Sequence, residues 1–368
     1  MSGPERSGGA DVNAPPSVVL VTGVSRYLGA HLAARLAADE RVRRVVALDT
    51  SAPVGALAEV LSAAGPKLDL HQIDLRTPGV LRVMVDARVE AVAHLAVATA
   101  TDQHGGRAAM KELNVIGTMQ LLAACQQAPR LRKLIVRSST AAYGASFRDP
   151  AIFTEDTEPR EVPRGGFAKD VLDIEGYVRG FRRRRPDVAA TVLRFAPFIG
   201  SAVDTRLTRY FAQPVVTTVF GRDPRLQFLH VDDAFEVLVR SVTEEHPGTY
   251  NVAGGGTLTL SQAVRRAGRV TMPILEPGLN VLAGLGRAGV TLDQLDLFVH
   301  GRVVDTGKLI REFGFTPRTT AEAFGEFVRS RRERELLPAD TIRSVEQALL
   351  DGFRRTRAAR AALESGDE

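Results

Sequence analysis

The fold is decided by residues 17–49, which read SVVLVTGVSRYLGAHLAARLAADERVRRVVALD. The apolar run 17–21 predicts a buried strand, and 28–39 has the apolar spacing of an amphipathic helix. A second apolar run, 45–48, predicts another strand that ends on Asp49. Strand, helix and strand in this order form a βαβ unit, whose two strands lie parallel in one sheet.

The turn between the first strand and the helix has the residues of a dinucleotide site. Gly23 and Gly29 allow a tight turn and a close approach of backbone to a pyrophosphate, and the helix that starts at Leu28 points its positive dipole end at that anion. Asp49 lies about 20 residues further on, where a carboxylate accepts hydrogen bonds from ribose hydroxyls and repels a 2′-phosphate. We therefore predict that the chain binds NAD in preference to NADP.

One position of this turn departs from the glycine pattern. Glycines at three-residue spacing would fall at positions 23, 26 and 29, and position 26 is Arg. Arg26 can cover the pyrophosphate as a cation, or its bulk can crowd the turn and weaken cofactor binding. The sequence leaves both outcomes open.

Composition narrows the class of protein. The chain has 368 residues, a net charge of +5 and no basic segment dense enough to indicate nucleic-acid binding. Its one cysteine, Cys125, excludes an internal disulfide and a cysteine-based zinc site, and we expect no metal. Residues 1–16 are polar and rich in Gly and Pro, so we expect a disordered N-terminus without a signal peptide. No apolar run reaches membrane-spanning length, and we expect a cytoplasmic protein.

Strands and helices continue to alternate after Asp49. This alternation predicts an α/β fold, a Rossmann-like doubly wound parallel sheet with helices on both faces. The expected strands are 67–73, 90–95, 134–137 and 191–195, and the expected helices are 53–64, 108–127 and 167–183.

Beyond residue 200 the elements become short and irregular, with strands near 215–220 and 226–229 and a helix at 232–242. We expect this part to form a smaller C-terminal substrate lobe. The expected segments are 1–16 (disordered), 17–200 (NAD-binding domain, to which 226–252 contributes), 201–330 (mainly substrate lobe) and 337–364 (C-terminal helical extension). The extension has one apolar face, which we expect to dock on the body or on a dimer mate.

Ligands of such sheets bind beyond the carboxyl ends of the strands. Asp74 follows the third strand, where a carboxylate can reach the adenine amino group, but it is equally suited to cap the next helix. Small residues after the fourth strand let backbone approach the cofactor. The cofactor candidates at this edge are Asp74, Leu75, Leu95, Ala96, Val97, Asn114 and Ser138.

The ordered motifs of the chain resemble those of the extended short-chain dehydrogenase/reductase family, also called the NAD-dependent epimerase/dehydratase family. The resemblance covers about 17–330, and within the family it is greatest to bacterial proteins that are named UDP-glucose 4-epimerases by similarity. Its carriers include Thr22-Gly23, Gly29, His94-Leu95-Ala96, Leu113–Thr118, Ser138–Gly144, Leu193-Arg194-Phe195 and His230–Ala234.

The resemblance implies catalysis by a Ser or Thr together with a Tyr-x-x-x-Lys pair. Matched position by position, Thr140 supplies the hydroxyl, and Lys169 supplies the lysine that also anchors the nicotinamide ribose. The position four residues before Lys169 is Gly165, so the catalytic tyrosine is missing. Tyr143 is the nearest candidate for another proton donor, and Glu155, Asp156 and Asp170 are further ones.

A nucleotide-sugar substrate is also implied by the resemblance, but the chain departs from the family pattern here. Pro197 stands where members have a substrate-binding Asn, and Leu226 where they have an Arg. Arg225 is one residue away, a step that reverses the face of a strand. The substrate candidates are Arg194, Arg225 and Arg302, although Arg194 can instead pair with a core carboxylate. Members often form homodimers through two helices, which here are 108–127 and 167–183.

Two functions therefore compete. The first is an NAD-binding epimerase/dehydratase-type oxidoreductase that acts on a nucleotide-sugar or a related hydroxyl or ketone substrate with a non-standard proton donor. The second is a catalytically silent NAD-binding sensor or scaffold. The turn, Asp49 and Lys169 favour the first, and Gly165 favours the second.

Overall fold

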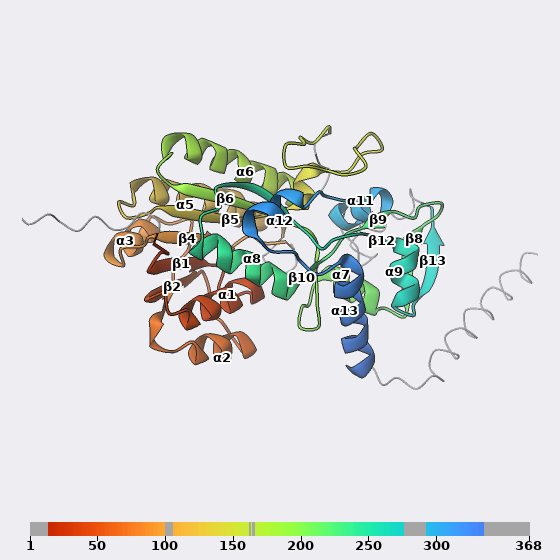
Figure 1. Cartoon of the computed structure of the whole chain (residues 1–368), viewed down its shortest axis with the longest axis horizontal. Helices are drawn as coiled ribbons and strands as arrows, with labels where there is room; N and C mark the ends of the chain where they lie inside the picture. The colour runs from red at the N-terminus through yellow and green to blue at the C-terminus, as the bar shows by residue number, and fades with distance from the viewer. Residues whose placement is uncertain (1–13, 100–105, 162, 164–165, 276–291, 335–368) are drawn as a thin grey trace, which may run out of the picture.

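A computed structural model of the chain describes residues 14–99, 106–161, 163, 166–275 and 292–334 (Figure 1). Three predictions lie outside the described residues: disorder before residue 14, the role of Gly165, and the C-terminal extension 337–364. None of the described helices is both long enough and apolar enough to cross a membrane.

The centre of the molecule is a seven-stranded parallel sheet, which confirms the predicted fold class. Its strand order is β11-β6-β5-β4-β1-β2-β3, so the winding direction reverses between β1 and β4, and ligands of such sheets bind in the crevice at the carboxyl ends of these strands. The strands are β1 (Val18–Thr22), β2 (Arg44–Asp49), β3 (Leu68–Gln72), β4 (Ala91–His94), β5 (Lys133–Ser139), β6 (Ala189–Phe195) and β11 (Gly248–Val252).

Helices cover both faces of this sheet (Figure 1). Along β1, Val19 and Val21 pack with the helices of one face, and Val18 and Leu20 pack with those of the other. A strand buried on both faces reads as an unbroken apolar run, which is the pattern of 17–21. The first face carries α1 (Tyr27–Ala38), α2 (Ala56–Ala63) and α8 (Val231–Thr243), and the second carries α3 (Gly79–Asp86), α5 (Gly117–Gln127) and α6 (Gly166–Arg184).

The helix expected at 108–127 is interrupted. It consists of α4 (Arg107–Lys111), a π-helical turn η2 (Glu112–Ile116) and α5. A π turn inside a helix often marks a functional position, and this one contains the buried Asn114. Apolar spacing alone does not reveal such a turn.

The second lobe has its own apolar core, in which the rings of Phe211, Phe228 and Phe324 pack against one another. Its elements are α7 (Arg206–Ala212), β8 (Val215–Val219), β9 (Arg225–Leu226), β12 (Leu258–Thr259), α9 (Leu260–Arg266), β13 (Val270–Ile274), α11 (Leu292–His300) and α13 (Thr320–Arg334). The chain also returns to the sheet, because α12 (Gly307–Phe313) packs its Leu309 and Phe313 into the first core cluster.

The single strand expected at 226–229 is wrong. The structure has two short strands there, β9 and β10 (Leu229–His230), which pair with different partners, β12 and β7 (Phe198–Ile199). Gln227 lies between them, and its side chain hydrogen-bonds Gly254 and Val304 from a buried position. The side-chain amide of Gln227 thus connects the second lobe to the segment that follows β11, at the point where the two short strands are interrupted.

Candidate functional site

Two glycines of the first turn are required by the backbone that surrounds them. Gly23 has a φ of 83°, and a Cβ atom there would lie 2.8 Å from the Ala96 nitrogen. A Cβ on Gly29 would lie 2.2 Å from the carbonyl oxygen of Gly23. The turn therefore fits closely against the end of β4, and any side chain would fill the cradle that a pyrophosphate needs.

Asp49 ties the end of β2 to the same turn. One of its oxygens accepts hydrogen bonds from the Ser25 backbone nitrogen at 2.8 Å and from Ser25 Oγ at 2.7 Å. The other oxygen accepts from the Thr50 nitrogen at 2.7 Å. The carboxylate is buried and acceptor-only, so its negative charge stays fixed at the rim of the crevice.

Arg26 is compatible with the turn, because the backbone at this position is extended, with a φ of −118°. The Nη1 atom of its guanidinium is buried and has no hydrogen-bond partner among the described residues. Burial lowers the pKa of Arg26, and the charge of Asp49 opposes that effect. An unsatisfied buried cation beside the glycine cradle favours the binding of an anion there. Cradle, carboxylate and cation together fit the adenosine diphosphate half of NAD.

Arg137 is a second cation at this edge, and the sequence reasoning missed it. It lies on β5, donates a hydrogen bond from Nη1 to the Val97 carbonyl at 3.1 Å, and stands 5.7 Å from the ring of Phe198. No carboxylate among the described residues forms an ion pair with it. Burial, followed by the positive charge of Arg26, lowers the pKa of Arg137 to about 10. The available signal was a charged residue that directly follows the apolar run 134–136.

A chain of hydrogen bonds fixes the loop after β4. Thr22 Oγ1 accepts from the nitrogens of Leu95 and Ala96, so its proton goes to His94 Nδ1 at 2.9 Å. His94 Nε2 then donates to Thr118 Oγ1 at 2.8 Å, which donates to the carbonyl of Asn114. Burial lowers the pKa of His94 to about 3, so the ring is neutral, as this pattern requires. His94 thereby helps to fix the backbone of Leu95 and Ala96, the loop that follows β4.

Asn114 is a brace for this loop, not a group that faces the crevice. Its amide pairs with both backbone groups of Ala98, at 2.7 and 2.9 Å, and donates to Asp170 at 3.0 Å. Asp170 is fully buried and also accepts two hydrogen bonds from the Arg107 guanidinium. Internal partners thus occupy the side chains of both Asn114 and Asp170, which argues against the predicted cofactor contact of Asn114 and the proton-donor role of Asp170.

Of the two candidates that follow β3, Asp74 lies at the surface and Leu75 lies in the core. Asp74 is bound by the guanidinium and the backbone nitrogen of Arg76, and the Arg76 hydrogen bond lowers the pKa of Asp74. Leu75 is 2 % exposed and packs in the second core cluster, as do Ala96 and Val97. Asp74 therefore stays ionised at the adenine end of the crevice, and the apolar residues form the floor.

Tyr143, the proton donor that the sequence suggests, is buried and engaged by internal partners, which argues against that role. Its side chain is 1 % exposed, and its hydroxyl lies 2.9 Å from the Thr154 carbonyl and 2.7 Å from Asn251 Oδ1. The hydroxyl also accepts a hydrogen bond from Arg194. Burial raises the pKa of Tyr143, which disfavours proton release further. The alternative donor Glu155 is likewise engaged, because Oε1 accepts from the Asn251 nitrogen.

The buried carboxylate of Glu175 binds two other predicted site residues, Arg194 and Ser138. Glu175 pairs with Arg194 through contacts of 2.9 and 2.7 Å, and it accepts a hydrogen bond from Ser138 Oγ. All three side chains are buried beneath the sheet edge. Arg194 thus pairs with a core carboxylate, which was the alternative to its predicted substrate role, and the hydroxyl of Ser138 is engaged by the same carboxylate.

The hydroxyl at the end of β5 needs a similar correction. Thr140 begins the short helix η3 (Thr140–Tyr143) and is 2 % exposed. Ser139, one residue earlier, remains partly exposed and caps that helix by accepting from the Ala141 nitrogen at 3.1 Å. Ser139 and Arg137 are two residues apart on a strand and so share one face. Ser139 is the hydroxyl that the fold leaves accessible.

Lys169 lies on the wrong side of α6 for the role that resemblance gave it. Lys169 is exposed and lies on the same face of the helix as the exposed residues Asp173 and Tyr177. The buried face of α6 contains Val171 and Glu175. The tyrosine and lysine of the family are four residues apart. The two side chains of α6 that face inward at this spacing are Phe167 and Val171, and Phe167 packs against the core cluster that contains Ala96 and Val97. Neither side chain can carry a proton.

Replacing Lys169 with alanine is therefore expected to leave the dissociation constant for NAD unchanged within about twofold, as for other surface substitutions. Calorimetric titration of the variant with NAD measures this, with Asp49→Asn as the positive control. A loss as large as that of Asp49→Asn would place the Lys169 ammonium at the cofactor and contradict the helix assignment.

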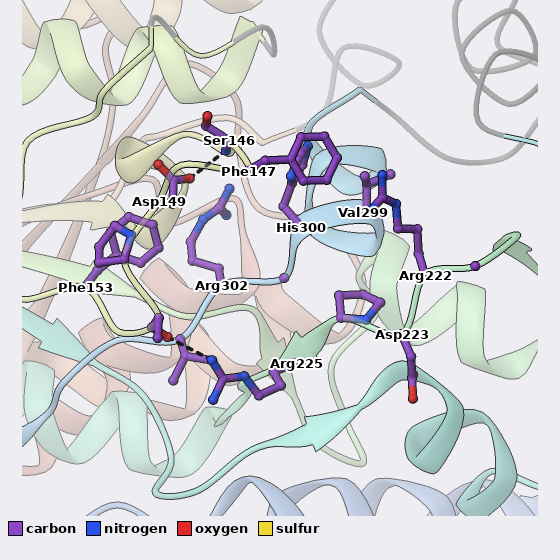
Figure 2. A pocket seen from close by; sticks show the side chains of 16 residues that line it. Ser146, Phe147, Asp149, Phe153, Arg222, Asp223, Arg225, Val299, His300 and Arg302 are labelled. Atoms are coloured by element: carbon purple, nitrogen blue, oxygen red, sulfur yellow. Dashed lines mark hydrogen bonds between the residues drawn. The ribbon is translucent and has the colours of Figure 1, made fainter.

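Arg225 and Arg302 do meet, at a cavity of about 380 Å³ between the two lobes (Figure 2). Arg302 donates two hydrogen bonds to the Gly144 carbonyl, and Arg225 donates one to the Ala151 carbonyl. The exposed Phe147 ring lies on the rim, 4.4 Å from the guanidinium carbon of Arg222. Three arginines (Arg222, Arg225 and Arg302) and two carboxylates (Asp149 and Asp223) line the cavity, so its lining has a net positive charge, which favours an anionic ligand.

Comparisons with known proteins agree with this geometry. The model of the NAD dependent epimerase/dehydratase family matches residues 19–253. Uncharacterized proteins of Mycobacterium bovis and Mycobacterium tuberculosis are 44% identical over 336 residues, which is 90% of this chain and 88% of theirs. UDP-glucose 4-epimerase 2 of Oryza sativa is 31% identical over 237 residues, 59% of this chain and 55% of that protein.

Solved structures show the same fold. UDP-glucose 4-epimerase of Thermotoga maritima, solved with UDP-glucose, superposes with a TM-score of 0.66 at 18% identity and covers 86% of this chain and 99% of its own. The Thermus thermophilus UDP-glucose 4-epimerase complex with NAD gives a TM-score of 0.65 at 21% identity, over 87% and 100%. By the extent of the family match and of the mycobacterial likeness, the chain belongs to the NAD dependent epimerase/dehydratase family, whose cofactor is NAD.

Proposed function

We propose that the protein is an NAD-dependent enzyme of the epimerase/dehydratase type that acts on a nucleotide-sugar or a related hydroxyl or ketone substrate, and that its proton path uses no tyrosine–lysine pair. The observation that carries this proposal is the cradle of Gly23 and Gly29, with Asp49 bonded to the same turn and Arg26 within it, whose buried Nη1 atom has no partner in the described part of the chain. When bound, NAD supplies hydride chemistry at its nicotinamide.

In this proposal each residue of the edge has a defined task. Asp49 holds the adenosine ribose, Arg26 neutralises the diphosphate, and the loop fixed by His94 forms the floor. Ser139 holds the reacting substrate oxygen by a hydrogen bond, and solvent supplies the proton. Because a positioned general acid or base contributes about 10²–10⁴-fold, turnover should be slower than in members with the tyrosine by about that factor.

The cationic cavity supports a nucleotide-sugar or similar anionic substrate. Arg225 and Arg302 both line it, and Phe147 offers an aromatic face to a planar base. The rice and Thermotoga proteins named above are UDP-glucose 4-epimerases, which makes UDP-glucose and UDP-galactose the first substrates to try.

The test is to load the purified protein with NAD and incubate it with UDP-glucose, UDP-galactose and a panel of ketones and alcohols. Product formation that is lost on Ser139→Ala supports the enzyme. The inward positions of Phe167 and Val171 favour a second candidate, a catalytically silent NAD-binding protein. Binding of NAD without turnover of any substrate would support that candidate instead.

A homodimer through the two helices of the second face is also proposed. Ile116, Met119 and Tyr177 are large apolar side chains that remain partly exposed on η2, α5 and α6, and α5 and α6 pack side by side (Figure 1). Sedimentation velocity should give twice the 39.7 kDa mass of one chain, and Met119→Glu should shift the species towards the monomer. A monomer at all concentrations would refute the proposal.

A further inference from the structure

Arg137 is a charged group whose counter-ion is not within the described part of the chain. Within the described residues, its guanidinium hydrogen-bonds the Val97 carbonyl and lies near the ring of Phe198. Two other arginines of this region, Arg194 and Arg107, do form ion pairs, with Glu175 and Asp170 respectively. Burying a guanidinium without a carboxylate partner lowers the stability of the folded protein. We therefore ask whether Arg137 acts on a bound ligand.

The topology places Arg137 in the nicotinamide half of the site. A dinucleotide lies across the crevice with its adenosine half over β1 and β2, where Asp49 and Arg26 are, and its other half over β4, β5 and β6. Arg137 belongs to β5, two strand spacings from β1, or about 9.5 Å. Its two contacts are with Val97, in the loop after β4, and with Phe198, in the segment after β6.

We propose that Arg137 makes the site select the reduced form of the cofactor. This inference rests on the proposed orientation of NAD. The oxidised nicotinamide ring carries a positive charge and the reduced ring carries none, so a fixed cation beside the ring repels only the oxidised form. With one like charge a few Å away in partly desolvated surroundings, the preference should be about tenfold or more.

The protonation state of Arg137 supports this assignment. Even with its pKa lowered to about 10, the guanidinium remains fully charged at neutral pH. Arg26 carries a second positive charge beside the glycine turn, where it can meet one of the two negative charges of the diphosphate. ADP-ribose, which keeps the diphosphate but lacks the ring, separates an action of Arg137 on the other charge from an action on the ring.

A preference for the reduced cofactor identifies the substrate class of the first half-reaction. That substrate is a ketone or aldehyde: its carbonyl carbon accepts the hydride, its oxygen takes a proton from solvent, and an alcohol and the oxidised cofactor result. The site would then begin with a reduction, and an alcohol substrate would react only with the less tightly bound oxidised cofactor.

The test is a calorimetric titration of cofactor-free protein with three probes: oxidised NAD, NADH and ADP-ribose, which lacks the nicotinamide. The wild-type protein should bind NADH about tenfold or more tightly than oxidised NAD. Arg137→Met should remove most of that ratio and leave ADP-ribose binding unchanged, and Arg137→Lys, which keeps the charge, should preserve the ratio. Arg26→Met is the matched control and should weaken all three probes by a similar factor.

Three results would overturn the proposal. An equal ratio in the wild type and in Arg137→Met would show that the cation does not act on the ring. A loss of ADP-ribose affinity in Arg137→Met equal to the loss of NADH affinity would assign Arg137 to the diphosphate. Failure of every probe to bind the wild type would refute NAD binding itself, and with it this inference. Thermal unfolding of each variant shows that the comparisons are made on folded protein.

Discussion

Replacing Gly29 with alanine is expected to abolish NAD binding and to lower the free energy of unfolding by about 3 kcal/mol. The added Cβ would stand 2.2 Å from the Gly23 carbonyl oxygen, and that oxygen belongs to backbone that already fits against Leu95 and Ala96. The clash cannot be relieved by a rotamer change, so the turn must move, and the cradle for the diphosphate moves with it. Urea denaturation and calorimetric titration with NAD measure the two effects.

Gly176 provides the matched control, because it also lies inside a helix but has open space around it. The nearest atom to a Cβ there is the flexible end of Arg179, at 3.8 Å. Alanine at a permissive helical glycine usually stabilises by about 0.4–1 kcal/mol. If Gly29→Ala behaved like Gly176→Ala in both measurements, the close contact between the two halves of the turn would not exist.

The second large effect is expected from Glu175→Gln, which should lower the free energy of unfolding by about 3–5 kcal/mol. The substitution leaves the Arg194 guanidinium buried without a counter-charge and weakens the hydrogen bond from Ser138. Because Arg194 also donates to the Tyr143 hydroxyl, the disturbance should reach the packing around η3. Chemical denaturation followed by circular dichroism gives the change.

Two comparisons separate this effect from a general cost of losing an ion pair. Asp204→Asn breaks the exposed pair with Arg209, whose side chains are 63% and 52% exposed, and should cost about 0–1 kcal/mol. The double variant Glu175→Met with Arg194→Met removes both charges and should regain part of the loss. A cost for Glu175→Gln no larger than that of Asp204→Asn would contradict the buried pair.

The sheet and the adenosine half of the site could be predicted from sequence because their signals are local. An apolar run, a glycine turn and a carboxylate at fixed spacing specify one βαβ unit, and Gly23, Gly29 and Asp49 lie within 27 consecutive residues. Their positions depend on backbone geometry that the unit itself creates. The same holds for the alternating strands, whose apolar runs follow from burial on both faces.

The catalytic half could not be predicted in this way, because tertiary packing decides which side of α6 faces inward. Lys169 was chosen by its residue type, and the helix turns it to solvent. Glu175 pairs with Arg194 and lies on the buried face of α6, not on the face of Lys169. It would have indicated which face of the helix points inward. For Ser138 and Tyr143, sequence gave the correct segment but not the burial that engages both hydroxyls elsewhere.

Arg137 was overlooked for a different reason. Its neighbours on β5 are the apolar core residues Ile135 and Val136, and a charge at the end of a strand is ordinarily a surface feature. Only the surroundings show that this charge has no carboxylate partner among the described residues. A charged side chain inside a run that otherwise predicts a buried strand is therefore worth treating as a site candidate.

The central claim is that a dinucleotide lies over the glycine turn with its adenosine ribose held by Asp49. The most direct measurement is calorimetric titration with NAD and NADP of the wild type, of Asp49→Asn and of Ser25→Ala, which removes a turn contact but keeps the carboxylate. Saturable NAD binding, much weaker NADP binding, and a preference that disappears in Asp49→Asn but survives in Ser25→Ala are expected. No saturation with NAD, or equal binding of NADP by the wild type, would contradict the account.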